Sequence, residues 1–201
     1  MSDTLTQHVW RDWPALGEID ASVVTVGVFD GFHRGHVGLV EAARAEGRRL
    51  GLPTVLVTFE PHPLVVLAPE RAPLQLLSVD DRVAQALALG VDGVVVLPFT
   101  RELAAQPAAD FVEKGLVARL GVRSLVVGDN FHCGRGGEGD VAFLSAAGGR
   151  LGFDVSGVDL VCHGTRTCSS TEVRRALAAG DLATARDLLG RNDPRIAAMV
   201  D

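Results

Sequence analysis

Short segments rich in Val and Leu alternate with amphipathic segments along most of the chain, and this alternation constrains the fold more than any other feature. The apolar segments lie near residues 23–28, 54–58, 93–97, 123–127 and 153–158. Apolar residues at helical spacing lie near residues 35–50, 78–89, 107–120, 140–149, 170–179 and 181–189. Strands that alternate with helices pair in parallel through right-handed crossovers. We therefore expect an α/β fold with a Rossmann-like, doubly wound parallel sheet.

A glycine-rich turn joins the first predicted strand to the first predicted helix. The run Gly27–His36 contains Gly31 and Gly35, which allow a close approach of the backbone to a ligand, and it ends in His33-Arg34-Gly35-His36. Unpaired N–H groups and the positive end of the helix dipole make such a turn an anion site. The turn therefore predicts phosphate binding, with two histidines as donors. A pair of surface or capping histidines is the alternative.

Four motifs in series carry a family resemblance. His33-Arg34-Gly35-His36 resembles the HxGH signature of nucleotidyltransferases. The other motifs are Phe59-Glu60-Pro61-His62-Pro63, Val126-Val127-Gly128-Asp129-Asn130-Phe131 with Gly134, and Ser169-Ser170-Thr171-Glu172-Val173-Arg174. In this order and spacing, they resemble the FMN adenylyltransferase (FAD synthetase) module of prokaryotic bifunctional riboflavin kinase/FAD synthetases. The first, second and fourth predicted strands each end in a motif, so the motifs should meet in one cleft.

The resemblance implies a nucleotidyltransferase-type sheet and an enzyme of FAD biosynthesis. Such an enzyme transfers AMP from ATP to FMN and releases FAD and pyrophosphate, by positioning and charge stabilisation at the α-phosphate. It implies catalytic roles for His33, His36 and Arg174. The implied nucleotide-binding residues are Gly27, Phe29, Asp30, Gly31, Gly35, Ser169, Ser170 and Thr171. The implied flavin-binding residues are Asn130, Phe59, His62 and Phe131. We expect Mg²⁺ to enter with ATP, and no protein ligand for the metal is identified.

Several of these residues have structural alternatives. Asp30 is suited to orient a histidine, to accept a substrate hydroxyl or to cap the following helix. The hydroxyls of residues 169–171 are suited to cap a helix, although Arg174 one turn later favours triphosphate binding. Asn130 is also typical of an Asx-turn, and Phe59 of a core position. Arg34 is expected to point to solvent.

Two segments break the alternation of strands and helices. Residues 61–77 contain four prolines, which predicts an irregular excursion over the sheet edge. Residues 131–140 are rich in glycine and carry Arg135 and Glu138, which predicts a mobile polar loop. In the resembled family such loops form the flavin side of the pocket. An ordinary surface connection is the alternative for the glycine loop.

The expected organisation is one domain with short flanks. Residues 1–22 form an N-terminal extension, residues 23–191 form the FMN adenylyltransferase-like domain, and residues 192–201 form a short tail. The tail is too short for a riboflavin kinase domain, which follows this module in the bifunctional members. The sequence is therefore that of a monofunctional protein or of a piece cut at a domain boundary.

Composition narrows the class of partner. The net charge of −6 disfavours general nucleic-acid binding, and no apolar run approaches the ~20 residues that cross a bilayer. No signal-peptide pattern is present, so we expect a cytoplasmic enzyme. The three cysteines, Cys133, Cys162 and Cys168, lack metal-ligand spacing. Nothing in the sequence indicates an oligomeric state.

Two other functions stay open at this point. One is a related nucleotidyltransferase that acts on another phosphorylated small molecule or uses another nucleoside triphosphate. The residues His132 and Cys133 depart from the bulkier or more basic residues common in the resembled family, and they keep this alternative open. The other is a non-catalytic protein that binds flavin or nucleotide, which the two histidines and Arg174 disfavour.

Overall fold

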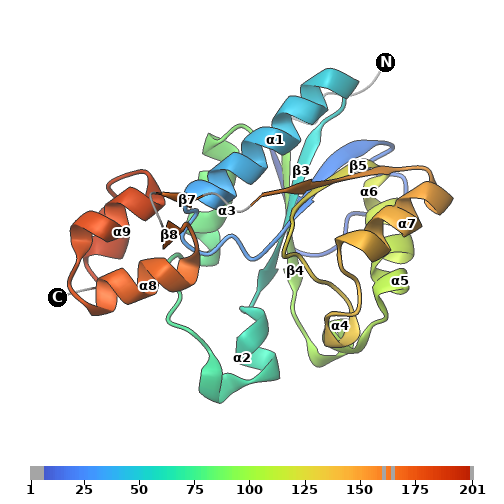
Figure 1. Ribbon diagram of the computed structural model, residues 1–201. Coiled ribbons are helices and arrows are strands. Elements are labelled where there is room, and N and C mark those ends of the chain that lie inside the picture. Colours follow the sequence, from blue (N-terminus) through green and yellow to red (C-terminus); the bar gives the residue numbers. More distant parts are fainter. Residues whose placement is uncertain (1–6, 160–161, 164–165, 200–201) are drawn as a thin grey trace.

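The computed structural model describes residues 7–159, 162–163 and 166–199. A six-stranded, all-parallel sheet runs through its centre in the order β1-β4-β3-β2-β5-β6 (Figure 1). The strands are β1 (His8–Trp10), β2 (Ser22–Val26), β3 (Thr54–Glu60), β4 (Gly93–Pro98), β5 (Val122–Gly128) and β6 (Asp154–Val158). A separate antiparallel pair consists of β7 (Cys162–His163) and β8 (Arg166–Thr167). The predicted doubly wound α/β fold is confirmed.

Helices cover both faces of this sheet (Figure 1). One face is covered by α1 (Arg34–Leu50) and α3 (Val79–Ala88). The helices α8 (Ser170–Ala178), α9 (Leu182–Leu189) and α10 (Pro194–Ala197) contribute residues to the same apolar cluster. The other face is covered by a continuous stretch of α5 (Ala108–Asp110), the π-helical η2 (Phe111–Val117) and α6 (Ala118–Leu120), and by α7 (Val141–Leu151). Shorter helical turns are α2 (Pro63–Leu67), η1 (Pro69–Arg71), α4 (Arg101–Ala105) and η3 (Arg135–Gly137). Among the described residues, no helix is both long and apolar enough to span a bilayer.

The two-residue period of the strands divides the core into two layers. Val23 packs in the cluster under α1, whereas Val24 and Val26 pack in the cluster under η2 and α7. In β3, Leu56 belongs to the first layer and its neighbours to the second. The four central strands are buried on both faces, which explains their nearly continuous Val and Leu composition.

The strand order places a topological switch at β2. From β2 the chain continues through α1 to β3 on one side of the sheet, while β5 and β6 lie on the other side. Ligands of open α/β sheets bind outside the carboxyl ends of the strands at such a switch. The turn after β2, which carries His33 and His36, lies at this point.

Three segments contain more structure than the sequence predicts. The N-terminal residues contribute the edge strand β1, whose Trp10 pairs with Val95 of β4. Residues 61–77 contain α2 and η1 instead of an irregular excursion, and the C-terminal residues contribute α10, whose Ile196 is 1% exposed. Each of these elements is shorter than two helical turns or a typical strand, so its apolar periodicity is too brief to recognise.

Gly121, the glycine that follows α6, lies close to the backbone that precedes β2. Gly121 has φ +53°, and an added Cβ would lie 2.3 Å from the carbonyl oxygen of Asp20. Gly152 ends α7 with φ +81° and has open space around it. We expect Gly152→Ala to cost about 1 kcal/mol of unfolding free energy for its left-handed backbone, and Gly121→Ala to cost clearly more. Urea unfolding of both variants measures the difference, and equal costs would contradict the close approach.

Candidate active site

A cavity of about 670 Å³ opens at the carboxyl ends of the parallel strands. Its wall takes residues from the ends of β2, β3, β5 and β6 and from the segment after β4. Many of the residues singled out in the sequence line it, namely Gly27, Phe29, His33, Gly35, His36, Phe59, Asn130, Phe131 and Ser169. The volume is in the usual range for a small-molecule site. The structure therefore brings residues from all four sequence motifs to one cavity.

The other predicted site residues do not line this cavity. They are Asp30, Gly31, His62, Ser170, Thr171 and Arg174. Thr171 is exposed, whereas Asp30 and Gly31 are buried behind the turn. His62 caps α2 by accepting a hydrogen bond at Nδ1 from the N–H of Leu64 at 3.1 Å. The contacts of these residues show what they do outside the cavity lining.

The two histidines of the turn stack on each other. Their ring centroids lie 3.7 Å apart with 22° between the planes, and the His36 ring also contacts Phe29 at 5.1 Å. His33 is the N-cap of α1, and its Nδ1 accepts the backbone N–H of His36 at 3.4 Å. A neutral imidazole that accepts at Nδ1 carries its proton on Nε2. His33 therefore both caps the helix and retains a donor for a ligand.

Both histidines are held in the neutral form. Burial lowers the pKa of His33 to about 4, with further contributions from the charges of Arg191 and Arg174. Burial also lowers the pKa of His36 well below its usual value, and the nearby His33 adds to this effect. At pH 7 the pair therefore presents neutral donors, and the positive charge near the cavity comes from arginines.

Two helix N-termini meet at the cavity. His33 caps α1, and Ser169 caps α8 because its Oγ accepts the N–H of Glu172 at 3.2 Å. Both capping residues line the cavity. Helix N-termini attract anions through their free N–H groups and the helix dipole. Ser169 therefore both caps α8 and lines the cavity. Ser170 instead donates from Oγ to the carbonyl of Asp30 at 2.7 Å.

Asp30 does not cap α1. Its Oδ1 accepts the N–H groups of Leu76 and Leu77 at 2.9 and 3.1 Å, and its Oδ2 accepts Nη2 of Arg174 at 2.7 Å. The same arginine donates from Nε to the carbonyl of Leu74 at 2.7 Å. Asp30 thus ties the segment before α3 and the start of α8 to the histidine turn. Arg34 is exposed, as expected, and it donates from Nε to the carbonyl of Asp187 at 2.6 Å.

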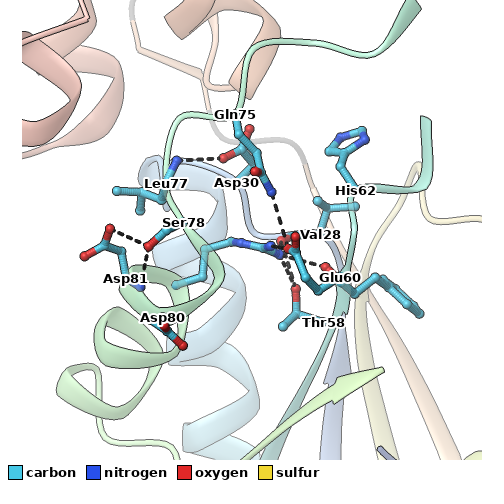
Figure 2. Close-up of polar contacts among 12 residues, drawn as sticks. Val28, Asp30, Thr58, Glu60, His62, Gln75, Leu77, Ser78, Asp80 and Asp81 are labelled. Atoms are coloured by element: carbon cyan, nitrogen blue, oxygen red, sulfur yellow. Dashed lines mark hydrogen bonds and ion pairs between the residues drawn. The ribbon is translucent and has the colours of Figure 1, made fainter. Parts of the chain in front are cut away.

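A buried arginine of α3 joins the ends of two strands. Arg82 is 1% exposed and donates from Nη1 to the carbonyl of Val28 at 3.0 Å and of Phe59 at 3.0 Å. It also donates from Nη1 to Oγ1 of Thr58 at 2.9 Å and forms an ion pair with Glu60. Figure 2 shows Val28, Thr58 and Glu60 gathered at one point. Since Val28 and Phe59 both line the cavity, Arg82 sets the spacing of its walls.

One end of the cavity is aromatic. Phe59 and Phe99 meet edge to face with centroids 5.7 Å apart, and Phe111 and Phe131 complete this region of the wall. Phe99 and Phe111 were not predicted. Phe99 lies two residues beyond Leu97, which pairs with Phe59 of the neighbouring β3, so the parallel register could have indicated it. Phe111 comes from η2, and no local pattern distinguishes it from a core residue.

The glycine loop, residues 131–140, also lines the cavity, which argues against an ordinary surface connection. Its backbone is tied at several points. Cys133 and Gly139 exchange backbone hydrogen bonds at 2.9 Å, and Glu138 accepts the N–H of Ala108 at 2.8 Å. Gly134 lies so close to Ala108 that a Cβ would come within 2.5 Å of its backbone. The loop is thus an ordered turn fixed against α5.

Within residues 7–159, 162–163 and 166–199, no group of three or more His, Cys, Asp or Glu side chains is placed to hold a metal ion. Asp159 is the carboxylate among the described residues that line the cavity. Cys133 lies in the cavity wall, and burial raises the pKa of its thiol to about 11. The side chain of Cys162 falls outside the described residues.

Comparison with known proteins identifies the family. The family model described as FAD synthetase matches residues 17–172. The chain belongs to the FAD synthetase family. The matched region includes β2 to β6, the histidine turn and the first residues of α8, so the motif resemblance is confirmed over the residues that form the cavity.

The curated relatives are larger proteins. The chain is 42% identical over 171 residues to the bifunctional riboflavin kinase/FMN adenylyltransferase of Escherichia coli (strain K12), covering 85% of this chain and 55% of the relative. The protein of the same name from Pseudomonas fluorescens is 44% identical over 169 residues, covering 84% of this chain and 54% of the relative. The chain thus spans about half the length of the curated relatives it matches.

A solved structure has a similar fold. The crystal structure titled macrolide-efflux protein from Streptococcus pneumoniae matches with a TM-score of 0.79 and 26% identity. The match covers 92% of this FAD synthetase family chain and 60% of the other chain.

The neutral state of His33 predicts a pH-dependent stability. The pKa of a histidine is about 6.5 in the unfolded chain and about 4 at His33 in the folded chain. The unfolded state therefore binds the proton first, and stability falls as pH drops from about 6.5 towards 4, by about 3 kcal/mol for this residue. Denaturant unfolding at several pH values measures the effect. His33→Gln should reduce this loss, whereas His8→Gln, at an exposed position, should leave it unchanged.

Proposed function

We propose that this chain transfers AMP from ATP to FMN, giving FAD and pyrophosphate. The observation that carries the proposal is the cavity in which two helix N-termini and the stacked His33–His36 pair adjoin an aromatic region. One end suits phosphates and the other suits a flat apolar ring. Membership of the FAD synthetase family and the names of the curated relatives support the same reaction.

The reaction needs positioning more than a strong base. A phosphate oxygen of FMN attacks the α-phosphorus of ATP, the new P–O bond forms, and the bond to pyrophosphate breaks. The attacking phosphate is already ionised at pH 7, so no proton has to be removed from it. Alignment of the two substrates and stabilisation of the developing charge then account for catalysis. The cavity supplies fixed donors for both tasks.

The neutral histidines fit the role of phosphate donors. The capping bond at Nδ1 leaves the Nε2–H of His33 as its donor group, and the stacked ring of His36 is held between His33 and Phe29. Gly27 and Gly35 line the same region, where a phosphate can approach backbone N–H groups closely. We expect Ser169 and the start of α8 to face the triphosphate.

Arg174 acts from behind the cavity wall in this arrangement. Its guanidinium is bound to Asp30 and to the carbonyl of Leu74, and its charge reaches His33. We expect it to stabilise the triphosphate electrostatically, or directly after a change of rotamer. In the rotamer that the structure shows, Asp30 orients it.

The flavin is expected at the aromatic end. Phe59, Phe99 and Phe111 offer apolar faces and edges to an isoalloxazine ring, and Asn130 and the glycine loop lie beside them. A divalent ion, Mg²⁺ in our proposal, is expected to arrive on the triphosphate, because it keeps several waters and substrate oxygens as ligands. The carboxylate of Asp159 in the cavity lining, together with the substrate phosphates, would supply oxygen ligands that suit this ion. The ion would offset phosphate charge.

The first test is product analysis. The protein is incubated with Mg-ATP and either FMN or riboflavin, and flavins are separated by chromatography. We expect FAD from FMN. No FAD, together with release of pyrophosphate from ATP in the presence of a different phosphorylated acceptor, would favour the alternative nucleotidyltransferase.

The histidine variant tests the site. His36→Ala should lower kcat by at least about tenfold, because one donor to the phosphates is lost. The matched control, His8→Ala, removes an exposed histidine of β1 and should keep wild-type turnover. Circular dichroism confirms that both variants are folded. Near-normal turnover of a folded His36→Ala protein would remove His36 from the mechanism.

The arginine variant tests the division of the site. Arg174→Ala should raise the Kd for Mg-ATP about tenfold, since one charge next to the triphosphate is lost, and should change the Kd for FMN much less. Arg175→Ala is the control, because Arg175 is exposed and pairs with Glu172 on the outer side of α8. Calorimetry measures both ligands, and equal losses for ATP and FMN would contradict the assignment.

A further inference from the structure

The segment after α9 reaches back to the histidine turn. Arg191 donates from Nη1 to the carbonyl of Phe32 at 2.6 Å and from Nη2 to the carbonyl of Gly31 at 2.9 Å. These bonds join residues about 160 positions apart in the sequence. A guanidinium holds its donors in a rigid plane, so one side chain fixes two successive carbonyls. Sequence reasoning placed Arg191 only at the end of a domain.

Arg191 is itself held in place. Oδ2 of Asp193 accepts Nε and Nη2 of Arg191 at 3.2 and 3.0 Å, and the Asp193 side chain is 2% exposed. Arg195 binds the same carboxylate and reaches Asp81 at the start of α3. Burial alone would raise the pKa of Asp193, but bonds from Arg195 and Arg191 outweigh it and lower the pKa. The carboxylate therefore stays charged at neutral pH and orients Arg191.

The turn needs such support because its backbone is unusual. Phe29 and Phe32 have φ of 54° and 42°, in the left-handed region that side chains disfavour. Gly31 has φ of 79°. The carbonyls of Gly31 and Phe32 lie in a buried turn, where an acceptor without a partner costs about 1–3 kcal/mol. Arg191 satisfies both acceptors in the residues directly before His33.

Arg191 also acts on His33 through its charge. After burial, Arg191 is the largest contributor to the low pKa of His33, followed by Arg174. The stacked His36 is neutral, and Asp30 is paired with Arg174. Loss of the Arg191 charge would therefore make His33 easier to protonate, and protonation removes the Nδ1 acceptor that caps α1.

We propose that Arg191 is a positioning residue for adenylyl transfer, which holds the carbonyls of Gly31 and Phe32 and thereby fixes the turn that presents His33 to the cavity. This inference rests on the proposed function and deepens it. It gives residues 191–195 a role in the reaction, although they lie outside the cavity and follow the last family motif.

Two variants separate the contributions of Arg191. Arg191→Met removes the charge and both hydrogen bonds, whereas Arg191→Lys keeps the charge but replaces the planar fork with a single ammonium group. The matched control is Arg44→Met, because Arg44 is another partly buried arginine that donates to a backbone carbonyl, that of Gly90 at 2.8 Å. Each protein is assayed for FAD formation from FMN and Mg-ATP, and His33 is titrated by NMR of the imidazole nitrogens.

In Arg191→Met we expect kcat to fall about tenfold or more, with KM for ATP and FMN changed less than about threefold. The pKa of His33 should rise from about 4 towards 6.5. In Arg191→Lys, kcat should also fall, while the pKa of His33 stays close to the wild-type value. Arg44→Met should match the wild type in both readouts. If Arg191 served only stability, the variants would lower the folded fraction, and Arg191→Met and Arg191→Lys would not differ in the pKa of His33.

The result that overturns the inference is a folded Arg191→Met protein with wild-type kcat and an unchanged His33 titration. If Arg191→Met does not fold, Arg191→Lys decides, and wild-type kcat in that variant would show that the planar fork is not needed. The NMR titration requires no turnover. An inactive wild-type protein would therefore count against the proposed function, whereas an unmoved His33 titration would count against Arg191 alone.

Discussion

The active-site turn depends on two buried phenylalanines beneath it. Phe29 and Phe32 are fully buried, and their rings stack at 5.4 Å within the core under α1. Burial of each ring contributes about 1.5–3 kcal/mol, which is of the size needed to offset the cost of about 1–2 kcal/mol for a left-handed backbone. The apolar core thus holds the turn in a conformation that it would not adopt alone. That conformation brings His33 and His36 side by side at the end of β2.

Polar contacts hold the same turn from its other sides. They come from arginines that lie outside the cavity lining. Arg82, Arg174 and Arg191 bind carbonyls or carboxylates around the turn, and none of the three lines the cavity. The charges of Arg191 and Arg174 act on His33 in the cavity wall, although each of these guanidinium groups is also paired with a carboxylate. Burial is the main reason why the pKa of His33 is low, and the charges of Arg191 and Arg174 lower it further, so His33 stays neutral beside a site that suits phosphates. The net charge of −6 is therefore a poor guide to what this cavity attracts.

The sequence predicted the fold and much of the cavity because both follow from local patterns. Strand and helix periods are read within about ten residues, and parallel strands bring their carboxyl ends to one edge. The roles of Asp30, Arg82 and Arg191 were missed because their hydrogen-bond partners are distant in sequence. The separation is 46 residues from Asp30 to Leu76, 54 from Arg82 to Val28 and 159 from Arg191 to Phe32. A charged residue inside an amphipathic helix normally faces solvent, so no local pattern marks Arg82 as buried.

The same long-range contacts bear on where the folded unit ends. A boundary at residue 191 would separate Arg191 from Asp193, the carboxylate that orients it. It would also remove Ile196, which is 1% exposed and packs in the same core as Phe29 and Phe32. Residues 193–196 therefore belong to the packing that holds the histidine turn.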